Sequence, residues 1–353
     1  MRIVVAMSGG VDSSVAAALL ARDGHEVIGL SMQLYDQSDG HRQFGSCCTL
    51  DDLHDARRVA ARLGIPHYIV NFEAKFNETV VSDFVREYAA GRTPIPCVHC
   101  NGDLKFATLV ERAAGFDASL VATGHYARVE HDAEASRYRL LRGADPTKDQ
   151  SYFLFTLTQA QLAHALFPIG GLDKAAVREY ARELQLAVAD KPDSHEICFV
   201  PGGDHATFLQ QHGIPASDGV IRDIEGQVIG KHEGIHRFTV GQRKGLGLSS
   251  PIPLYVLDID ADTHAVTVGP RGALDKRQLS ASDLNWISGA PPAAGTRVTA
   301  QIRHRHQEAA ATITPLGADR VSLIFDEPQS AIAPGQALVM YSADEVVGGG
   351  WID

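Results

Sequence analysis

The chain opens with MRIVVAMSGGVDSSVAAALLARDG (residues 1–24), and this stretch decides the fold. The apolar run Ile3–Met7 predicts a buried strand, and the Ala- and Leu-rich run Val11–Arg22 predicts a helix. Ser8-Gly9-Gly10 lies between them, which predicts a tight turn with backbone N–H groups directed at an anion. Strand, glycine turn and helix in this order are typical of an α/β protein.

The alternation of strand and helix patterns continues to about residue 200. It predicts a parallel sheet with helices on both faces, a Rossmann-like α/β arrangement. Further strands are expected at Glu26–Met32, His67–Val70 and Ala118–Thr123, and further helices at Leu53–Leu63, Asn77–Ala90 and Leu104–Ala114.

After the Pro-Gly-Gly sequence in FVPGGDHATF (199–208) the predicted segments become shorter and turn residues more frequent. YVLDIDADTHAVTVGP (255–270) alternates with period two around an Asp-rich turn, which predicts antiparallel hairpins. From residue 275 onward several strands joined by short turns predict a closed β-barrel, which hides strand edges. We therefore expect an α/β domain over 1–200, a small mixed or β central domain over 201–274 and a β-barrel over 275–353.

Charge and hydrophobicity limit the classes of partner that the protein can have. The 353 residues carry a formal net charge of −11, which disfavours broad, sequence-blind nucleic-acid binding but leaves a local basic groove open. Apolar runs are too short to cross a bilayer, and the N-terminus lacks the features of a secretory signal. We expect a cytoplasmic protein without a membrane partner.

The opening loop excludes two common nucleotide motifs. It has no lysine, as a Walker loop requires, and Gly9 and Gly10 are adjacent rather than spaced as in a dinucleotide fingerprint. What remains is a turn that suits a compact, multiply charged anion, with Ser hydroxyls as donors and Asp12 to orient the loop or a Mg²⁺ ion. A capped turn without any ligand is the plain alternative.

The chain has five cysteines, an odd number at irregular spacing that does not resemble a secreted disulfide framework. Cys100 precedes a helix expected to begin near Asp103, and a helix N-terminus favours the thiolate. Cys97-x-x-Cys100 could also be half a zinc site or a redox pair, although no second pair has ligand spacing. Cys198 alone could be a core residue, and structural roles are expected for Cys47 and Cys48.

Ser8-Gly9-Gly10-Val11-Asp12-Ser13 resembles the pyrophosphate loop of the N-type ATP pyrophosphatases, which split ATP between its α- and β-phosphates. Blocks along nearly the whole chain resemble the tRNA-uridine 2-sulfurtransferases (tRNA-specific 2-thiouridylases) in that family's order. These blocks are AMSGGVDSSVAA, CCTLDDLHDARRVAARLGIPHYIVNF, GRTP…CN…LKF, ATGHYAR, KDQSYFL, DSHEICFV, TVGQRKGLGL and GGGWI.

The resemblance implies ATP-dependent 2-thiolation of the wobble uridine of tRNA. The uridine O2 would be adenylated with loss of pyrophosphate, and a cysteine persulfide would then supply sulfur. Cys198 would carry the persulfide and Cys100 would be the nucleophilic partner. The implied cofactors are ATP and its Mg²⁺, with no stably bound metal. The implied partners are tRNA and a persulfide donor protein, which the sequence does not name.

The resemblance also implies the nucleotide contacts. Met32 matches a position whose backbone meets adenine, although core packing is the plainer interpretation, and Gly124 matches a glycine beside the nucleotide. The implied ATP residues are Ala6, Met7, Ser8, Gly9, Gly10, Val11, Asp12, Ser13, Met32 and Gly124.

The implied RNA contacts are spread over the chain, and the wobble base would have to be flipped out to reach the thiols. Within IRHRH (302–306), an arginine beside an imidazole suits phosphate contact and stacking, but a solvated barrel strand is an equal alternative. The implied tRNA residues are Ile95, Pro96, Cys97, His125, Lys148, Asp149, Gln150, Arg303, His304 and Gln336.

The chain departs from the family pattern at one place. Cys97 stands where many members have Asp, and Ile95 stands where Asn is frequent. Either the carboxylate is dispensable or a neighbour such as His99 or Asp103 supplies its role; Cys97 could also pair with Cys100.

Two rival functions remain at this point. A pyrophosphate-loop ligase or amidotransferase would not need Cys100 and Cys198. A non-catalytic, ATP-dependent RNA-binding protein would not yield AMP and pyrophosphate.

Overall fold

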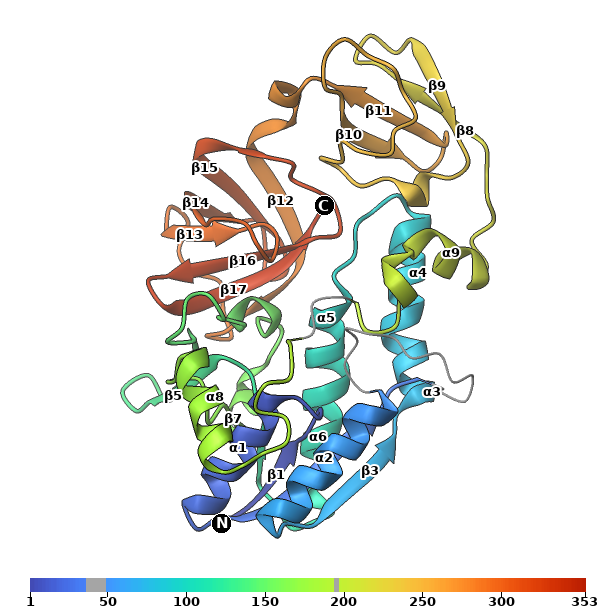
Figure 1. The fold of residues 1–353 in the computed structure, drawn as a ribbon. Coiled ribbons are helices and arrows are strands. Elements are labelled where there is room, and N and C mark those ends of the chain that lie inside the picture. Colours follow the sequence, from blue (N-terminus) through green and yellow to red (C-terminus); the bar gives the residue numbers. More distant parts are fainter. Residues whose placement is uncertain (36–48, 194–196) are drawn as a thin grey trace.

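The computed structural model describes residues 1–35, 49–193 and 197–353, so Cys47 and Cys48 lie outside the described residues. The N-terminal α/β domain, the central β domain and the C-terminal barrel form three bodies (Figure 1). Within the described part of the chain, no helix is both long enough and apolar enough to cross a membrane.

A five-stranded parallel sheet forms the first domain, as predicted. The strand order is β3-β2-β1-β4-β7, so the chain order reverses beside β1. Ligands of open α/β sheets bind at such a reversal, outside the carboxyl ends of the strands. The strands are β1 (Arg2–Ala6), β2 (Glu26–Gln33), β3 (His67–Asn71), β4 (Leu120–Ala122) and β7 (Ala165–Leu166).

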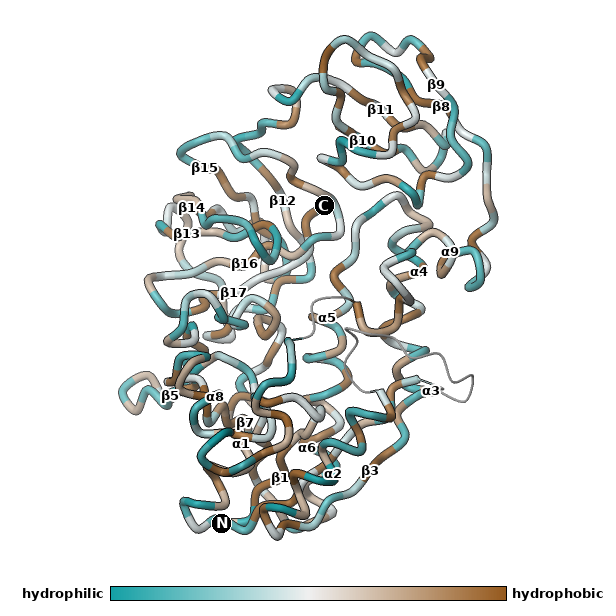
Figure 2. Tube along the Cα trace, in the orientation of Figure 1, coloured by the Kyte–Doolittle hydropathy of each residue, from teal (hydrophilic) through white to brown (hydrophobic). Residues whose placement is uncertain are grey.

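Helices cover both faces of this sheet, because side chains of β1 alternate between two buried clusters. Ile3 and Val5 pack with α1 (Val11–Arg22), α2 (Leu50–Leu63) and α8 (Lys174–Glu183). Val4 packs on the other side with α4 (Ser82–Ala89) and α6 (Ala107–Ala114). The central strand β1 and helix α1 are accordingly hydrophobic along most of their length (Figure 2).

Three helices begin earlier than the sequence predicted, and the first of them, α2, does so by three residues. The helix expected at Asn77–Ala90 is preceded by α3 (Glu73–Phe76) and the π-helical η1 (Asn77–Val81) before α4. The helix expected at Leu104–Ala114 begins instead with α5 (Pro96–His99) and continues through the π-helical η2 (Cys100–Phe106) into α6. Pro96 starts this helix at a position where its missing N–H costs nothing. Cys100 therefore lies one turn inside the helix, and the expectation that it precedes the helix start is wrong.

The central domain is a four-stranded sheet in the order β10-β11-β8-β9 around Ile221, Val256 and Val266. The hairpin predicted at 255–270 is present as the antiparallel pair β10 and β11. The strands are β8 (Gly219–Arg222), β9 (Val228–His232), β10 (Tyr255–Asp260) and β11 (Ala265–Gly269). Shorter helices before and within this domain are η3 (Ser151–Phe153), α7 (Gln159–Leu162), η4 (Pro201–Gly203), α9 (His205–Gln211), η5 (Ile235–Arg237) and η6 (Arg271–Leu274).

The C-terminal domain is the predicted closed barrel, because the first strand β12 also pairs with the last strand β17. The hairpin of β5 (Ala127–Asp132) and β6 (Arg137–Arg142) leaves the first domain and extends this sheet through the pair Glu345 and Leu141. The barrel strands are β12 (Asp275–Trp286), β13 (Arg297–Gln301), β14 (Ala309–Pro315), β15 (Val321–Ser330), β16 (Ala337–Ser342) and β17 (Glu345–Ile352).

Candidate active site

The glycine turn lies between β1 and α1 and is tightly enclosed. Gly9 has a φ of +75°, and a β-carbon there would stand 2.1 Å from the carbonyl oxygen of Asp52 at the start of α2. A β-carbon at Gly124, after β4, would stand 2.4 Å from the backbone nitrogen of Ser13. Only glycine fits at either position, so the close approach of three segments is built into the sequence.

The N-terminus of α1 faces this turn without a side-chain cap, because its N-cap residue is Gly10. Ser14 is buried, and its hydroxyl donates to the Gly10 carbonyl at 2.8 Å. The Ser13 hydroxyl accepts the Ser8 N–H at 3.2 Å, whereas Ser8 itself is exposed. An uncapped helix start with ordered serines has the character of an anion site.

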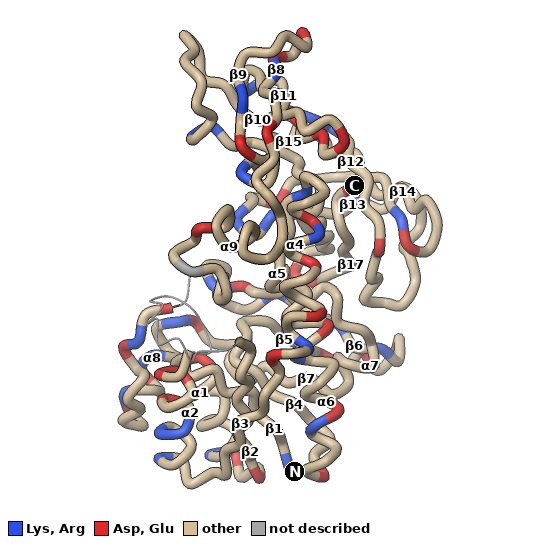
Figure 3. Tube along the Cα trace, turned by 90° about the vertical axis from the view of Figure 1, so that its right-hand side faces the viewer, with Lys and Arg blue, Asp and Glu red and all other residues tan. Residues whose placement is uncertain are grey.

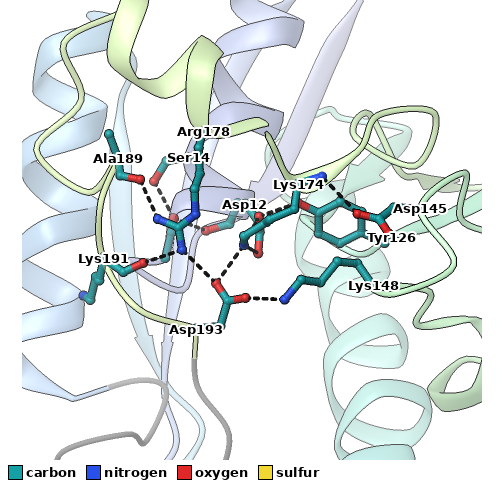
Figure 4. Close-up of polar contacts among 12 residues, drawn as sticks. Asp12, Ser14, Tyr126, Asp145, Lys148, Lys174, Arg178, Ala189, Lys191 and Asp193 are labelled. Carbon is teal, nitrogen blue, oxygen red and sulfur yellow. Dashed lines mark hydrogen bonds and ion pairs between the residues drawn. The ribbon is translucent and has the colours of Figure 1, made fainter. Parts of the chain in front are cut away.

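Charged side chains from distant segments gather beside the turn (Figure 4). Lys174 lies 2.8 Å from Asp12 and 2.8 Å from Asp193, and Lys148 lies 2.7 Å from Asp193. Burial alone would raise the pKa of Asp193, but the bonds from Lys148 and Lys174 outweigh burial and lower this pKa to about 2. Asp193 is therefore a carboxylate at neutral pH.

Asp12 is also fixed by Tyr126, whose hydroxyl donates to the Asp12 carboxylate at 2.8 Å. Burial and the neighbouring charge of Asp12 raise the pKa of Tyr126, so the phenol keeps its proton. The loop carboxylate is thus held between a phenol and an ammonium group.

Lys191 ties the loop to α2. Its ammonium donates to the Gly9 carbonyl at 3.0 Å and forms ion pairs of 2.6 Å with Asp52 and Asp55. Arg178 on α8 donates to the carbonyls of Ala189 and Lys191 at 2.8 and 3.1 Å, which pins the same segment.

Sequence reasoning missed Lys174, Arg178, Lys191 and Asp193. Lys191 and Asp193 lie in the run DKPD (190–193), whose last residue begins the DSHEICFV block, but nothing in the run indicates their partners, and Lys174 and Arg178 lie outside it. Ion pairs between residues of different segments leave no periodic pattern in the sequence.

The predicted ATP residues divide into two groups. Loop residues from the end of β1 to the start of α1 meet Gly124 at the carboxyl edge of the sheet. Met32 lies at the end of β2 with a side chain only 6% exposed, inside the cluster that also holds Leu30 and Leu34. Its side chain is core, so only its backbone is left to face a nucleotide.

Cys100 and Cys198 belong to the surroundings of one hydrophobic cluster although nearly a hundred residues separate them in the sequence. Cys100 is buried within the cluster, and the half-buried Cys198 packs against it. Phe199 anchors the second segment, since its ring makes edge contacts with Phe76 and Phe84 at 5.4 and 5.2 Å.

His99 and Asp103, the neighbours considered as substitutes for the missing carboxylate, are bonded to each other at 2.8 Å. His99 also lies 3.3 Å from Asp83, and its ring stacks on Trp351 of β17 at 4.6 Å. Burial lowers the pKa of His99, but the bond to Asp103 and the charge of Asp83 outweigh burial and raise it. Among residues 1–35, 49–193 and 197–353, no group of three or more His, Cys, Asp or Glu side chains could hold a metal ion.

The segment before Cys100 is docked on the barrel. Gln336 donates to the Thr93 carbonyl at 2.9 Å, and the Thr93 N–H donates to the Pro334 carbonyl at 2.8 Å. In the neighbouring segment Ile95 is partly buried, Pro96 is buried and Cys97 is exposed. The structure therefore brings four predicted RNA residues, Gln336 and 95–97, to one domain boundary.

The block Lys148-Asp149-Gln150 faces inward. Asp149 accepts the N–H groups of Gly143 and Ser151, each at 3.0 Å, and Gln150 accepts the Tyr126 N–H at 3.0 Å. The side chains of Asp149 and Gln150 are therefore bonded within the protein. The ammonium group of Lys148 is directed at Asp193, beside the glycine turn (Figure 4).

His125 and His304 also have internal partners. His125 lies 2.8 Å from the Thr123 hydroxyl, and burial together with the charge of Lys105 lowers its pKa to about 3. His304 packs on Phe153 at 4.5 Å, and its pKa is lowered by burial and then by Arg305. Both imidazoles are neutral at pH 7.

Arg303 donates to the Ser330 carbonyl at 3.1 Å. It and His304 lie in a turn after β13, so the alternative of a barrel strand is wrong for these residues.

Comparison with known proteins identifies the family. Residues 1–202 match the family model described as tRNA methyl transferase HUP domain. Residues 206–270 match its PRC-barrel domain, and residues 276–352 match the aminomethyltransferase beta-barrel domain.

Full-length relatives carry one name. The chain is 53% identical to tRNA-specific 2-thiouridylase MnmA of Geotalea uraniireducens, over 100% of this chain and 95% of the relative. It is 52% identical to the protein of that name from Solibacter usitatus, over 99% of both chains. Among solved structures, a 4-thiouridine synthetase–RNA complex with bound ATP has 15% identity and a TM-score of 0.35, covering 60% of this chain and 49% of that chain. The matches over the full length place this chain in the tRNA-specific 2-thiouridylase (MnmA) family.

Proposed function

We propose that this protein catalyses the ATP-dependent 2-thiolation of the wobble uridine of tRNA. The observation that carries the proposal is one α/β domain with two features. Its uncapped glycine turn at the sheet reversal suits a diphosphate, and one of its two hydrophobic clusters contains Cys100 and packs against Cys198. Its relatives over the full length are named tRNA-specific 2-thiouridylase.

In the first step ATP lies with its β,γ-diphosphate at the N-terminus of α1. The uridine O2 attacks the α-phosphorus, the bond from that phosphorus to the bridging α,β-oxygen breaks, and pyrophosphate leaves with the bonding electrons. Backbone amides of the turn stabilise the charge that develops on the leaving group. Residues 6–13, the backbone of Met32 and Gly124 make this site.

Mg²⁺ would accompany the nucleotide, since this ion is held by one or two carboxylates together with substrate phosphates. Asp12 is the loop carboxylate placed to serve it, and the Asp12 oxygens now contact Lys174 and Tyr126. Bound Mg²⁺ would neutralise charge on the phosphate oxygens.

In the second step Cys198 carries a persulfide loaded by a donor protein. The terminal sulfur attacks C2 of the adenylated uridine, and AMP leaves with the former O2. The Cys100 thiolate then attacks the Cys198 sulfur and breaks the S–S bond, so 2-thiouridine and a Cys100–Cys198 disulfide are formed. An external dithiol reduces this disulfide before the next turnover.

The tRNA would lie against the boundary between the barrel and the segment before Cys100. Arg303, His304 and Gln336 come from the barrel, and residues 95–97 come from the first domain. The wobble base is flipped from the anticodon stack to reach the cysteines. Asp149 and Gln150 would act by shaping this surface, because their side chains are bonded within the protein.

Replacement of the two cysteines tests the proposal. Cys198→Ser and Cys100→Ser each abolish 2-thiouridine formation, while tRNA-dependent release of pyrophosphate persists in the first turnover, because adenylation needs neither sulfur. Mass spectrometry of tRNA nucleosides and a pyrophosphate assay measure the two results.

The matched control is Cys47→Ser, the same exchange at a cysteine that the proposal does not use, and this variant retains thiolation. Continued thiolation by both site variants, or ADP and phosphate as products, contradicts the proposal. A ligase would keep turning over without the cysteines.

A further inference from the structure

Lys174 occupies a position that helix stability does not favour. It is the first residue of α8, directly after the N-cap Asp173, where the helix dipole is unfavourable to a cation. Its side chain is only 12% exposed, so most of the hydration of the ammonium group is lost as well. Ion pairs with other segments, rather than the helix, therefore hold this cation at the helix start.

The ammonium group of Lys174 bridges two carboxylates that belong to different segments. It lies 2.8 Å from Asp12 in the glycine turn and 2.8 Å from Asp193 in the segment before Cys198. Asp193 receives two more cations, Lys148 at 2.7 Å and Arg178 at 3.4 Å (Figure 4). The Asp193 carboxylate thus forms ion pairs with three cations beside the glycine turn.

We propose that Lys174 and Lys148 bind the diphosphate group that ATP releases, and that Asp193 holds these two cations in place until the nucleotide arrives. The assignment rests on the proposed function, which places ATP at the glycine turn. A diphosphate carries more negative charge and more acceptor oxygens than one carboxylate, and it therefore displaces Asp193 from the two ammonium groups.

This assignment gives Lys148 a different role from the one that the family resemblance implied. Its ammonium group is directed at Asp193, beside the glycine turn, and not at the barrel surface. Lys148 is then assigned to the nucleotide, whereas the resemblance assigned it to tRNA.

Binding of inorganic pyrophosphate to the full-length protein, measured by calorimetry without tRNA, tests the assignment. Lys174→Met and Lys148→Met each raise the Kd for pyrophosphate about ten- to a hundredfold, the effect of one lost charged hydrogen bond. Lys174→Arg keeps the charge and stays within a few fold of the unsubstituted protein. Arg182→Gln is the matched control, because Arg182 lies on the same helix in an exposed pair with Asp190.

Asp193→Asn separates binding from structural support. It removes the anion that competes for Lys148 and Lys174, so pyrophosphate binds several-fold more tightly. A purely structural role predicts the opposite, weaker binding in Asp193→Asn as in Lys174→Met. That result, or an unchanged Kd in Lys174→Met, overturns the assignment.

The assignment and the proposed function fail separately. If the unsubstituted protein forms 2-thiouridine but the lysine variants bind pyrophosphate normally, the assignment is wrong and the function stands. If the lysine variants lose pyrophosphate but the unsubstituted protein forms no 2-thiouridine, the diphosphate site stands and the function is wrong.

Discussion

Gly9 and Gly124 are the residues at which the nucleotide loop depends on a missing side chain. Both face backbone atoms rather than flexible side-chain ends, so a β-carbon at either position cannot be accommodated by a rotamer change. Sequence reasoning could predict this loop because glycine pairs between a strand and a helix carry a local conformational signal. Lys174 and Lys191 carry no local signal, since their partners come from other parts of the chain.

Gly9→Ala is therefore expected to damage both stability and ATP binding. The clash with the Asp52 carbonyl and the left-handed φ together cost about 2–4 kcal/mol of unfolding free energy. Urea unfolding and calorimetric titration with ATP measure the two effects. Gly171→Ala is the matched control, since a β-carbon there meets nothing within 4 Å. Equal stability of the two variants contradicts the account of the loop.

The helix over 96–114 is the element that sequence reasoning described least well. CVHCNG (97–102) contains few strong helix formers, so its helical conformation depends on tertiary contacts instead. Gly102 lies in its π-helical segment η2, where a β-carbon would stand 2.3 Å from the Thr156 hydroxyl. π-Helical turns are frequent at functional sites, and this one contains Cys100.

A double-mutant cycle tests this packing. Gly102→Ala alone is expected to cost about 1–3 kcal/mol, the range for overpacking. Thr156→Ala alone costs little, because the buried Thr156 hydroxyl has no hydrogen-bond partner among the residues that the structure describes. The double variant recovers part of the loss, because the hydroxyl is gone although the β-carbon of residue 156 would still stand 3.2 Å away. Additive costs in urea unfolding would exclude this contact as the constraint on the helix.

At the scale of the whole molecule, the sequence predicted the three bodies but not how they join. Strand alternation is local and visible, and barrel closure follows from the need to hide edges. The first domain and the barrel share a buried hydrophobic cluster that includes Phe155 and Tyr341. Backbone and side-chain contacts such as Gln336 with Thr93 add to it, and none of these partners is close in the sequence. Acidic and basic residues are interspersed through all three bodies, so net charge does not locate the RNA surface either (Figure 3).

Neutral histidines that are buried or half-buried in each of the three domains predict acid sensitivity of the whole molecule. Burial is the main cause that lowers the pKa of His67, His236 and His306. A lowered pKa means that the unfolded chain binds more protons, so stability is complete above the unfolded pKa of about 6.5 and falls as pH decreases below it. His99, with a raised pKa, contributes in the opposite sense, and its stabilisation is lost as pH rises.

The expected result is a lower urea midpoint at pH 5.5 than at pH 7.5, with each of these histidines contributing at most about 1.4 kcal/mol per pH unit. His236→Asn reduces the pH dependence because it removes one titrating group of the central domain. A midpoint that does not change over this range contradicts the prediction.

The most direct test of the central claim is a single turnover with protein loaded with a ³⁴S-labelled persulfide, given tRNA, ATP and Mg²⁺ and no other sulfur source. The account predicts ³⁴S at position 2 of the wobble uridine, one AMP and one pyrophosphate per thiolated tRNA, and a Cys100–Cys198 disulfide in the peptide map. A wobble uridine that carries no ³⁴S, or ADP in place of AMP, would contradict the account.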